Sequence, residues 1–225
     1  PEAEIEVIYN GASERFATIT ETERTRMRDK TRRELDIAED ETLMLTVAAL
    51  RWQKGHDLLL RVLPEILDSY PRTRWVWAGD GDQRKEFEGR LEALGLRHAV
   101  RILGHRSDID ALLCAADYFV FPTRFEGGQS FALGEAMMAG VPIITSDASG
   151  IPEVVTHDEH GVVVAREDAE ALRQGLCWAL ENPEVMQGFA AAAKERVQDF
   201  SEGKMIKRTI EVIEKTAHRW KGTKA

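Results

Sequence analysis

Short apolar runs alternate with amphipathic stretches of helical period along the chain from Thr42 onward. The runs have the length of buried strands, and the stretches between them have the spacing of helices that cover a sheet. This alternation is typical of a doubly wound, Rossmann-like α/β domain with a parallel sheet of about six strands. Strands are predicted at residues 43–50, 74–79, 99–104, 117–122, 141–146 and 160–165, with helices between them at 55–70, 82–95, 108–116, 130–140 and 150–155.

The pattern differs at both ends of the chain. Residues 4–16 predict a strand, a turn and a charged helix, and beyond Val164 the pattern is helical throughout. Ser201 has the residue type that caps a helix, and the last helix is expected to reach about Trp220. Because the chain has no internal repeat and no Pro- or Ser-rich linker, we interpret residues 1–225 as a single domain with extra helices at both ends.

Charge and hydropathy narrow the function classes. The 225 residues carry a net charge of −9, which argues against general nucleic-acid binding because phosphate contacts need clustered Lys and Arg. No apolar stretch approaches the roughly 20 residues of a membrane span, and the first residues lack a signal-peptide pattern. Cys114 and Cys177 lie in apolar helical patterns, so we interpret both as buried thiols in a reducing compartment. The sequence predicts a cytoplasmic protein without a transmembrane segment, and leaves peripheral membrane association open for a full-length protein.

In a doubly wound sheet, ligands bind beyond the carboxyl ends of the strands, so the loops there are the candidate sites. The loop after the first strand lacks G-x-G-x-x-G, which counts against a nicotinamide or flavin enzyme. It holds two cations, Arg51 and Lys54, followed by Gly55 at a helix start, and this arrangement favours an anion site. Two surface cations are the alternative. Trp52 beside them is expected either to stack on a ligand or to pack on its own domain.

Two D-x-D strings, at residues 80–82 and 108–110, have the composition of a metal site. Each also precedes a predicted helix, where Asp caps the first turn, and capping is the better account of both. We therefore predict no metal.

Glu135 is the one charged residue from Phe131 to Pro142. A helix that is apolar all round is buried, and an ionised carboxylate inside it is costly unless strong partners meet it. Two interpretations stay open. Either sugar hydroxyls of a ligand donate to Glu135, or an internal cation pairs with it, with Lys54 and Arg51 as the nearest candidates.

The loop before this helix is rich in glycine, which allows a ligand to approach the backbone closely. Glu126 stands at its start and is expected to be less constrained than Glu135, with a simple surface acid as the alternative. A helix that begins near Gln129 or Ser130 would leave free N–H groups as an anion site. The residues concerned in the loop and the first turn are Gly127, Gly128, Ser130, Phe131 and Ala132.

The segment PTRFEGGQSFALGEAMMAGVPIITSDASGIPEVV, residues 122–155, resembles part of the retaining glycosyltransferases of the GT-B fold, group 1 or family 4. The likeness lies in that family's E-x7-E segment, G-x-P strand and G-x-x-E helix. Supporting matches are KGHDLL, AGDGDQRKEFE, ILGH and ADYFVFPT. The resemblance runs from about Val7 to the final helix and implies the donor-binding domain of such an enzyme, which is one half of a GT-B fold.

The resemblance also implies a role for each motif. Lys54 would neutralise the diphosphate of a UDP-, GDP- or ADP-sugar, with Arg51 at the same phosphate, and Glu135 would accept hydrogen bonds from the ribose. Glu126, as the catalytic residue, and the backbone after it would hold the transferred sugar. Transfer would retain the anomeric configuration and need no metal or other cofactor. The main chain that would contact the base belongs to Leu103, Gly104, His105 and Arg106.

Two positions depart from the family pattern. Eight residues separate Glu126 from Glu135 where the family has seven, so Gly127 takes the expected acid position. The family's basic residue five positions before the lysine is Ala49 here, and Arg51 is its substitute from a shifted register.

Full-length members of this family also carry an N-terminal acceptor-binding domain, which this chain is expected to lack, so a missing domain or a partner subunit would complete the enzyme. The alternatives are a non-catalytic nucleotide-sugar-binding or protein-interaction module with this fold, and a sugar-nucleotide epimerase. An isolated half is expected to expose apolar surface where its companion packs, for example on the last helix.

Overall fold

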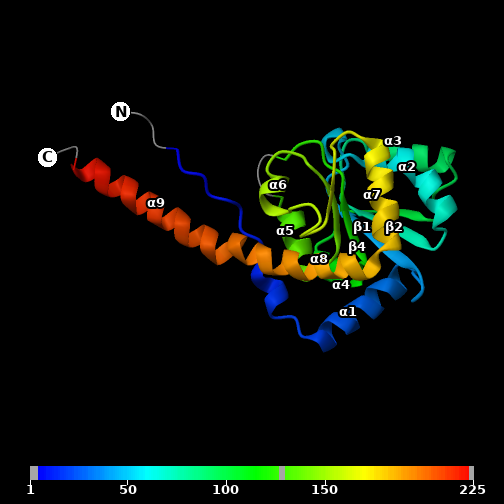
Figure 1. The fold of residues 1–225 in the computed structure, drawn as a ribbon, viewed down its shortest axis with the longest axis horizontal. Helices are drawn as coiled ribbons and strands as arrows, with labels where there is room; N and C mark the ends of the chain where they lie inside the picture. Colours follow the sequence, from blue (N-terminus) through cyan, green and yellow to red (C-terminus); the bar gives the residue numbers. More distant parts are fainter. Residues whose placement is uncertain (1–4, 127–129, 223–225) are drawn as a thin grey trace.

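The computed structural model describes residues 5–126 and 130–222. These residues form a six-stranded parallel sheet in the order β3-β2-β1-β4-β5-β6, with helices on both faces (Figure 1). The doubly wound α/β fold predicted from the apolar pattern is confirmed. The strands are β1 Thr42–Val47, β2 Thr73–Ala78, β3 Val100–Gly104, β4 Tyr118–Phe121, β5 Ile143–Ser146 and β6 Val162–Val164.

The strands read as continuous apolar runs because both faces of the sheet are covered. Leu43 and Leu45 of β1 belong to the hydrophobic cluster on one face, and Met44 between them belongs to the cluster on the other. Helices α4, α5 and α6 contribute to the first cluster, and α2, α3 and α7 to the second. The helices are η1 Glu14–Ala17, α1 Glu21–Glu34, η2 Trp52–Lys54, α2 His56–Ser69, α3 Arg84–Ala93, α4 Ile109–Ala115, α5 Phe131–Ala139, α6 Ile151–Val154, α7 Ala169–Glu181, α8 Pro183–Arg196, η3 Val197–Phe200 and α9 Glu202–Gly222.

The order of the strands places a topological switch point between β1 and β4. β1 pairs with β2 on one side and with β4 on the other, so the crossovers that leave β1 and β4 run in opposite directions along the sheet. In doubly wound sheets, ligands bind where two such loops diverge. The loops that follow β1 and β4 are therefore the place to look for a site.

The predicted N-terminal strand is not formed. Residues 5–11 run beside α9 instead (Figure 1), where the Tyr9 ring meets the Phe200 ring edge-on at 5.2 Å and Glu6 pairs with Arg208. Ile5 and Val7 of this segment are largely exposed, and Tyr9 makes its ring contact with Phe200 of η3.

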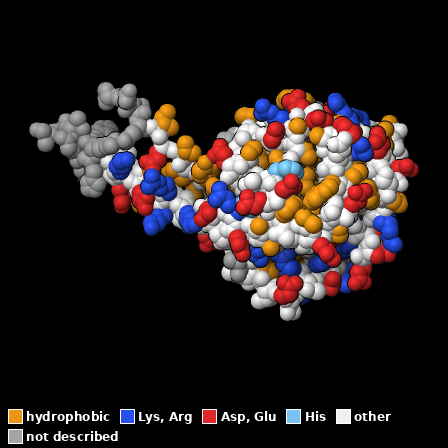
Figure 2. Space-filling model, viewed as in Figure 1, with side chains coloured by type: hydrophobic (Ala, Val, Ile, Leu, Met, Phe, Trp, Pro, Cys, Tyr) orange, Lys and Arg blue, Asp and Glu red, His pale blue; other side chains and the backbone are white. Residues whose placement is uncertain are grey.

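The last helix, α9, projects from the domain (Figure 1) and reaches Gly222, close to its predicted end. Ile206, Ile210 and Ile213 lie on one face of it and are each about half exposed or more, so the projecting arm carries apolar surface (Figure 2). Exposed apolar surface on the last helix agrees with the expectation for an isolated half. The side chain of Trp220 lies outside the described residues. Of the helices that the structure describes, none combines the length and apolar composition needed to cross a bilayer.

His56, the first residue of α2, is fully buried in the second hydrophobic cluster. Its ring lies between Trp77, at 4.9 Å between ring centroids, and Phe87, at 5.6 Å. Neither ring nitrogen has a hydrogen-bond partner in the structure. Burial therefore lowers the pKa of His56 from 6.5 to about 4, because the charged imidazolium would lose its hydration without a replacement.

We expect the free energy of unfolding to fall as the pH drops from about 6.5 to about 4. In this window the unfolded chain binds a proton at residue 56 that the folded protein does not bind, and the loss amounts to about 3 kcal/mol at most. His56→Phe should remove this part of the pH dependence in urea unfolding curves. His98→Phe, at an exposed position, is the control and should leave it intact. The same slope in both variants would contradict this assignment.

Candidate functional site

The loops after β1 and β4 are joined by hydrogen bonds at the switch point. The backbone N–H of Arg124 donates to the carbonyl of Gln53 at 2.8 Å, and the Thr123 hydroxyl oxygen lies 3.1 Å from the same carbonyl oxygen. The Gln53 side-chain amide donates in return to the carbonyl of Phe125 at 3.2 Å. Residues about 70 positions apart in sequence therefore form one surface.

Lys54 and Glu126 meet in this contact. The Lys54 ammonium lies 2.5 Å from Glu126 Oε1, and their side chains are 17% and 9% exposed. The Thr123 hydroxyl donates to the same carboxylate oxygen at 2.8 Å, and the Glu126 N–H donates to the Ser149 hydroxyl at 3.2 Å. The expectation of a weakly constrained Glu126 is therefore wrong: its carboxylate is buried and held by two partners. The structure brings together two residues that the family resemblance assigns to one ligand.

Gly55 allows the two loops to approach each other. Its φ of +74° is in the left-handed region, and a Cβ at this position would lie 1.9 Å from the carbonyl oxygen of Pro122. A residue with a side chain would therefore push the loop after β4 away from the start of α2.

A second ion pair in the contact was not predicted from the sequence. Arg124 donates to both carboxylate oxygens of Asp57, at 2.7 and 2.8 Å, and to the carbonyl of Trp52 at 2.6 Å. Burial raises the pKa of Asp57, but the hydrogen bonds and charge of Arg124 outweigh it, so the net pKa is below the usual range. A charged residue two positions after a buried strand is the sequence signal that points to such a contact.

Trp52 packs on its own domain, which is one of its two expected roles. One side of its ring lies over the Arg124 guanidinium, 4.7 Å from the ring centroid, so it packs on its own domain. The residue is nevertheless 58% exposed, so much of its ring surface is available to solvent.

Glu135 of α5 has an internal partner, but it is neither of the predicted cations. Its carboxylate pairs with the guanidinium of Arg15 from η1, and the two side chains are 16% and 42% exposed. The expectation of Lys54 or Arg51 as the internal partner is wrong, because Lys54 pairs with Glu126 and the Arg51 guanidinium faces Asp82 at 3.9 Å. Glu135 thus needs no ligand to be satisfied, and its nucleotide role rests on the family resemblance alone.

The start of α5 lies where the sequence predicts it. Ser130 is the N-cap, and Phe131 and Ala132 form the first turn of this nine-residue helix. Phe131 is largely exposed, so α5 is not buried all round as its composition suggests. Gly127 and Gly128 lie outside the described residues.

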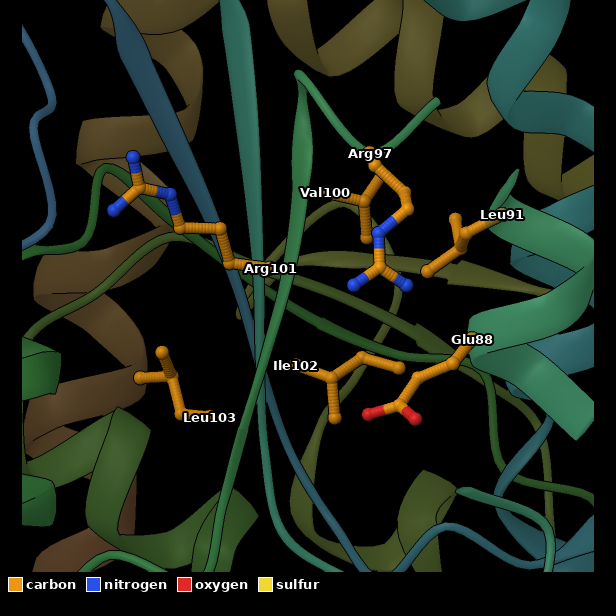
Figure 3. Close-up of a pocket in the computed structure, with 7 residues that line it drawn as sticks. All are labelled: Glu88, Leu91, Arg97, Val100, Arg101, Ile102 and Leu103. Atoms are coloured by element: carbon orange, nitrogen blue, oxygen red, sulfur yellow. The ribbon is translucent and has the colours of Figure 1, made fainter. Parts of the chain in front are cut away.

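Residues 103–106, expected to contact a base, form the end of β3 and the turn after it. Gly104 has a φ of +73°, and the Arg84 guanidinium lies 2.7 Å from the place of a Cβ. His105 is exposed, and Arg106 pairs with Asp108. Leu103 lines a cavity of about 240 Å³ beside β3, into which Arg97 and Glu88 point (Figure 3). β3 is the edge strand of the sheet, and β2 separates it from β1. The structure therefore does not join residues 103–106 to the Lys54–Glu126 pair at the switch point.

The aspartates of the two D-x-D strings have partners within the chain, but the expected capping is wrong: Gln83 is the N-cap of α3, and Asp108, the N-cap of α4, makes no side-chain cap hydrogen bond. Asp80 accepts from the Gly81 N–H at 2.8 Å and from Arg84 at 3.0 Å, and Asp108 accepts from Arg106 at 2.7 Å. Within residues 5–126 and 130–222, no three His, Cys, Asp or Glu side chains are placed to hold a metal ion.

The family of the chain follows from a sequence comparison. The family model of the group 1 glycosyl transferases matches residues 27–196, which include both loops of the switch point. The chain belongs to the group 1 glycosyl transferases. An uncharacterized glycosyltransferase from Methanocaldococcus jannaschii is 31% identical over 217 residues, which are 94% of this chain and 54% of that protein. Glycogen synthase of Mycobacterium tuberculosis is 31% identical over 156 residues, which are 68% of this chain and 37% of that enzyme.

Solved structures share the fold of this group 1 domain. HepE of Anabaena, in complex with UDP and glucose, has a TM-score of 0.84 at 23% identity, over 93% of this chain and 57% of that one. The C-terminal domain of LpcC, a group 1 family protein from Francisella tularensis, has a TM-score of 0.67 at 21% identity, over 76% of this chain and 91% of that one. These matches show that the chain shares the fold of these proteins, as the resemblance implied.

We expect Gly55→Ala to destabilise this domain more than Gly95→Ala. Both glycines have a left-handed φ, of +74° and +68°, but a Cβ at residue 95 meets nothing within 4 Å. The second variant therefore carries only the backbone cost of about 1–2 kcal/mol, and the first adds the collision with Pro122. The free energies of urea unfolding should differ by at least about 2 kcal/mol. Equal losses would show that the loops do not approach as described.

Proposed function

We propose that this chain is the donor-binding half of a retaining glycosyltransferase, which transfers a sugar from a nucleotide-diphosphate sugar to an acceptor hydroxyl. The observation that carries the proposal is the Lys54–Glu126 pair at the switch point of a group 1 domain. A lysine and a carboxylate, placed where doubly wound sheets bind ligands, suit a diphosphate and the hydroxyls of a sugar.

Lys54 is the residue for the diphosphate in this proposal. Its ammonium is paired with Glu126, so donor binding exchanges a carboxylate for phosphate oxygens as the partner of one cation. Glu126, released from Lys54, is then free to accept hydrogen bonds from the transferred sugar, and it is our candidate for the catalytic residue. The start of α5 adds N–H groups of Ser130, Phe131 and Ala132 for the phosphates.

Glu135 is proposed to bind the ribose, and the main chain of residues 103–106 to contact the base. For Glu135 this requires the Arg15 guanidinium to share or leave the carboxylate, since the two are paired in the structure. Arg51 is the weakest candidate for a phosphate contact, because its guanidinium lies in solvent near Asp82.

The donor is proposed to be a UDP-, GDP- or ADP-sugar, in a reaction without a metal. The UDP-glucose complex of HepE supports the first, and a relative named as a GDP-mannose-dependent mannosyltransferase in Corynebacterium glutamicum supports the second. A hexosyl group is the transferred sugar that these names favour.

The acceptor site is proposed to lie outside this chain. The chain spans 54% of its Methanocaldococcus relative and 57% of HepE, so a second domain or a partner subunit has room to complete the enzyme. The exposed isoleucines of α9 are a candidate contact with it. We propose a cytoplasmic location, with peripheral membrane association for a full-length protein.

A non-catalytic binding module with this fold is the second candidate. Glu126 is one residue out of the family register, and Ala49 replaces a basic residue. A protein-interaction module would give no response to donor nucleotides, whereas a non-catalytic nucleotide-sugar-binding module would respond without transferring a sugar.

UDP, GDP or ADP should raise the melting temperature of the chain. A nucleotide at 100 times its dissociation constant stabilises the fold by about 2.7 kcal/mol, which is about 5–10 °C for a domain of this size. Lys54→Met should abolish the shift relative to its own nucleotide-free baseline, and Lys207→Met, at an exposed position on α9, should keep it. If none of the three nucleotides stabilises the wild-type chain, the donor-binding proposal is wrong.

A second comparison separates the two possible reasons for an effect at Glu135. If Glu135 contacts the ribose, Glu135→Ala should weaken nucleotide binding at least about tenfold, whereas Arg15→Ala should not, since it leaves the carboxylate in place. Isothermal titration with the nucleotide that gives the largest thermal shift provides both dissociation constants. Equal weakening by the two variants would show that the ion pair matters rather than a contact of Glu135 with the nucleotide.

A further inference from the structure

Arg124 connects three parts of the switch point. It forms two hydrogen bonds with Asp57 in the first turn of α2, one with the carbonyl of Trp52 in η2, and its own N–H donates to Gln53. Its side chain is only 6% exposed. Both terminal nitrogens of this enclosed guanidinium are bonded within the chain, and its Nε is buried without a partner among the described residues. It is therefore a poor ligand contact, and any effect of Arg124 on a ligand passes through the residues that it holds.

Arg124 bonds the short turn η2, which carries Lys54. The single turn η2 spans three residues, Trp52–Lys54, and is closed by backbone hydrogen bonds of 2.9 Å from Lys54 to Arg51 and 3.2 Å from Gly55 to Trp52. A turn this short is not stable alone. Arg124, on the loop after β4, donates to the carbonyl of Trp52, the first residue of this turn. Asp57 of α2 in turn holds the Arg124 guanidinium.

Glu126 lies two positions after Arg124 on the same loop. A guanidinium bonded to η2 and α2 therefore sets the distance between the loop that carries Lys54 and the loop that carries Glu126. Replacement of a buried ion pair by apolar side chains is often neutral or stabilising, so stability alone gives no reason for this pair. Its bidentate geometry fixes direction as well as distance, which an apolar contact does not do.

We propose that Arg124 and Asp57 are positioning residues for donor binding, which hold the loops of Lys54 and Glu126 so that one nucleotide sugar contacts both side chains. This inference rests on the proposed function. It assigns to the Arg124–Asp57 pair a role in ligand affinity that is separate from its contribution to the stability of the fold.

The chain offers a matched control at the opposite end of the same strand. Arg32 is 7% exposed at its side chain, pairs with Asp117 at 3.1 Å and also bonds backbone carbonyls. Asp117 immediately precedes β4, whereas Arg124 follows it, so the two pairs lie at the amino and carboxyl ends of one strand. A general loss of stability should act alike in both places, and a positioning role should appear at the carboxyl end alone.

The test compares Arg124→Gln, Arg124→Lys, Asp57→Asn and Arg32→Gln in the 225-residue chain, well below the melting temperature of each. The probe is UDP, GDP or ADP, whichever stabilises the wild type most, titrated calorimetrically. Arg124→Gln and Asp57→Asn should each weaken binding at least about tenfold. Arg124→Lys should bind with an affinity between theirs and that of the wild type, because it keeps the charge but loses the bidentate hydrogen bonds of the guanidinium. Arg32→Gln should bind like the wild type. Wild-type affinity in both Arg124→Gln and Asp57→Asn would overturn the inference.

A second readout needs no nucleotide. In protein labelled with ¹⁵N-lysine, the ammonium signal of Lys54, assigned by its loss in Lys54→Arg, reports on the pairing with Glu126. It should shift or broaden in Arg124→Gln and Asp57→Asn and stay in place in Arg32→Gln. If the wild type binds none of the three nucleotides, the proposed function fails, and this signal still decides the positioning role: an unchanged Lys54 signal in both variants overturns it.

Discussion

The contact between the loops that follow β1 and β4 is the constraint on which the site depends. Adjacent parallel strands bring their carboxyl ends together, but the crossovers then leave in opposite directions, so nothing in the sheet itself holds the two loops against each other. Side chains do this instead, with Lys54–Glu126 and Arg124–Asp57 across the gap and Gly55 allowing backbone to meet backbone. Both ion pairs are shielded from water, where a charge without its partner is costly, so each loop restrains the other.

The same pairing governs the electrostatics of the region. Lys54, Arg124 and Arg15 are cations of this region, and each is matched by an acid from a different element. In the proposed function, a diphosphate would compete with Glu126 for Lys54, and a ribose would compete with Arg15 for Glu135. Affinity for a donor then reflects the difference between two sets of partners rather than attraction to an open charge.

The apolar pattern was enough to predict the sheet, its six strands and the helices between them, because strands covered on both faces are apolar throughout and differ sharply from their flanking turns. It failed at residues 5–11, which form no strand and whose Tyr9 ring contacts Phe200 of η3. The motifs predicted Lys54 and Glu126, which the structure joins. They did not predict Arg15 as the partner of Glu135, or Asp57 as the partner of Arg124. Those pairs join residues 120 and 67 positions apart, and local sequence spacing does not show which distant charged residue becomes the partner.

The short helix η1 connects the amino-terminal part of the chain to α5 through side-chain contacts. Phe16 belongs to the hydrophobic cluster beneath α5, and Arg15 beside it neutralises Glu135. Trimming the chain to begin at α1 would therefore leave a hole under one helix and an uncompensated carboxylate on it, although every strand would survive. Domain boundaries for expression are best drawn before η1, since the first regular strand is not where this domain's architecture starts.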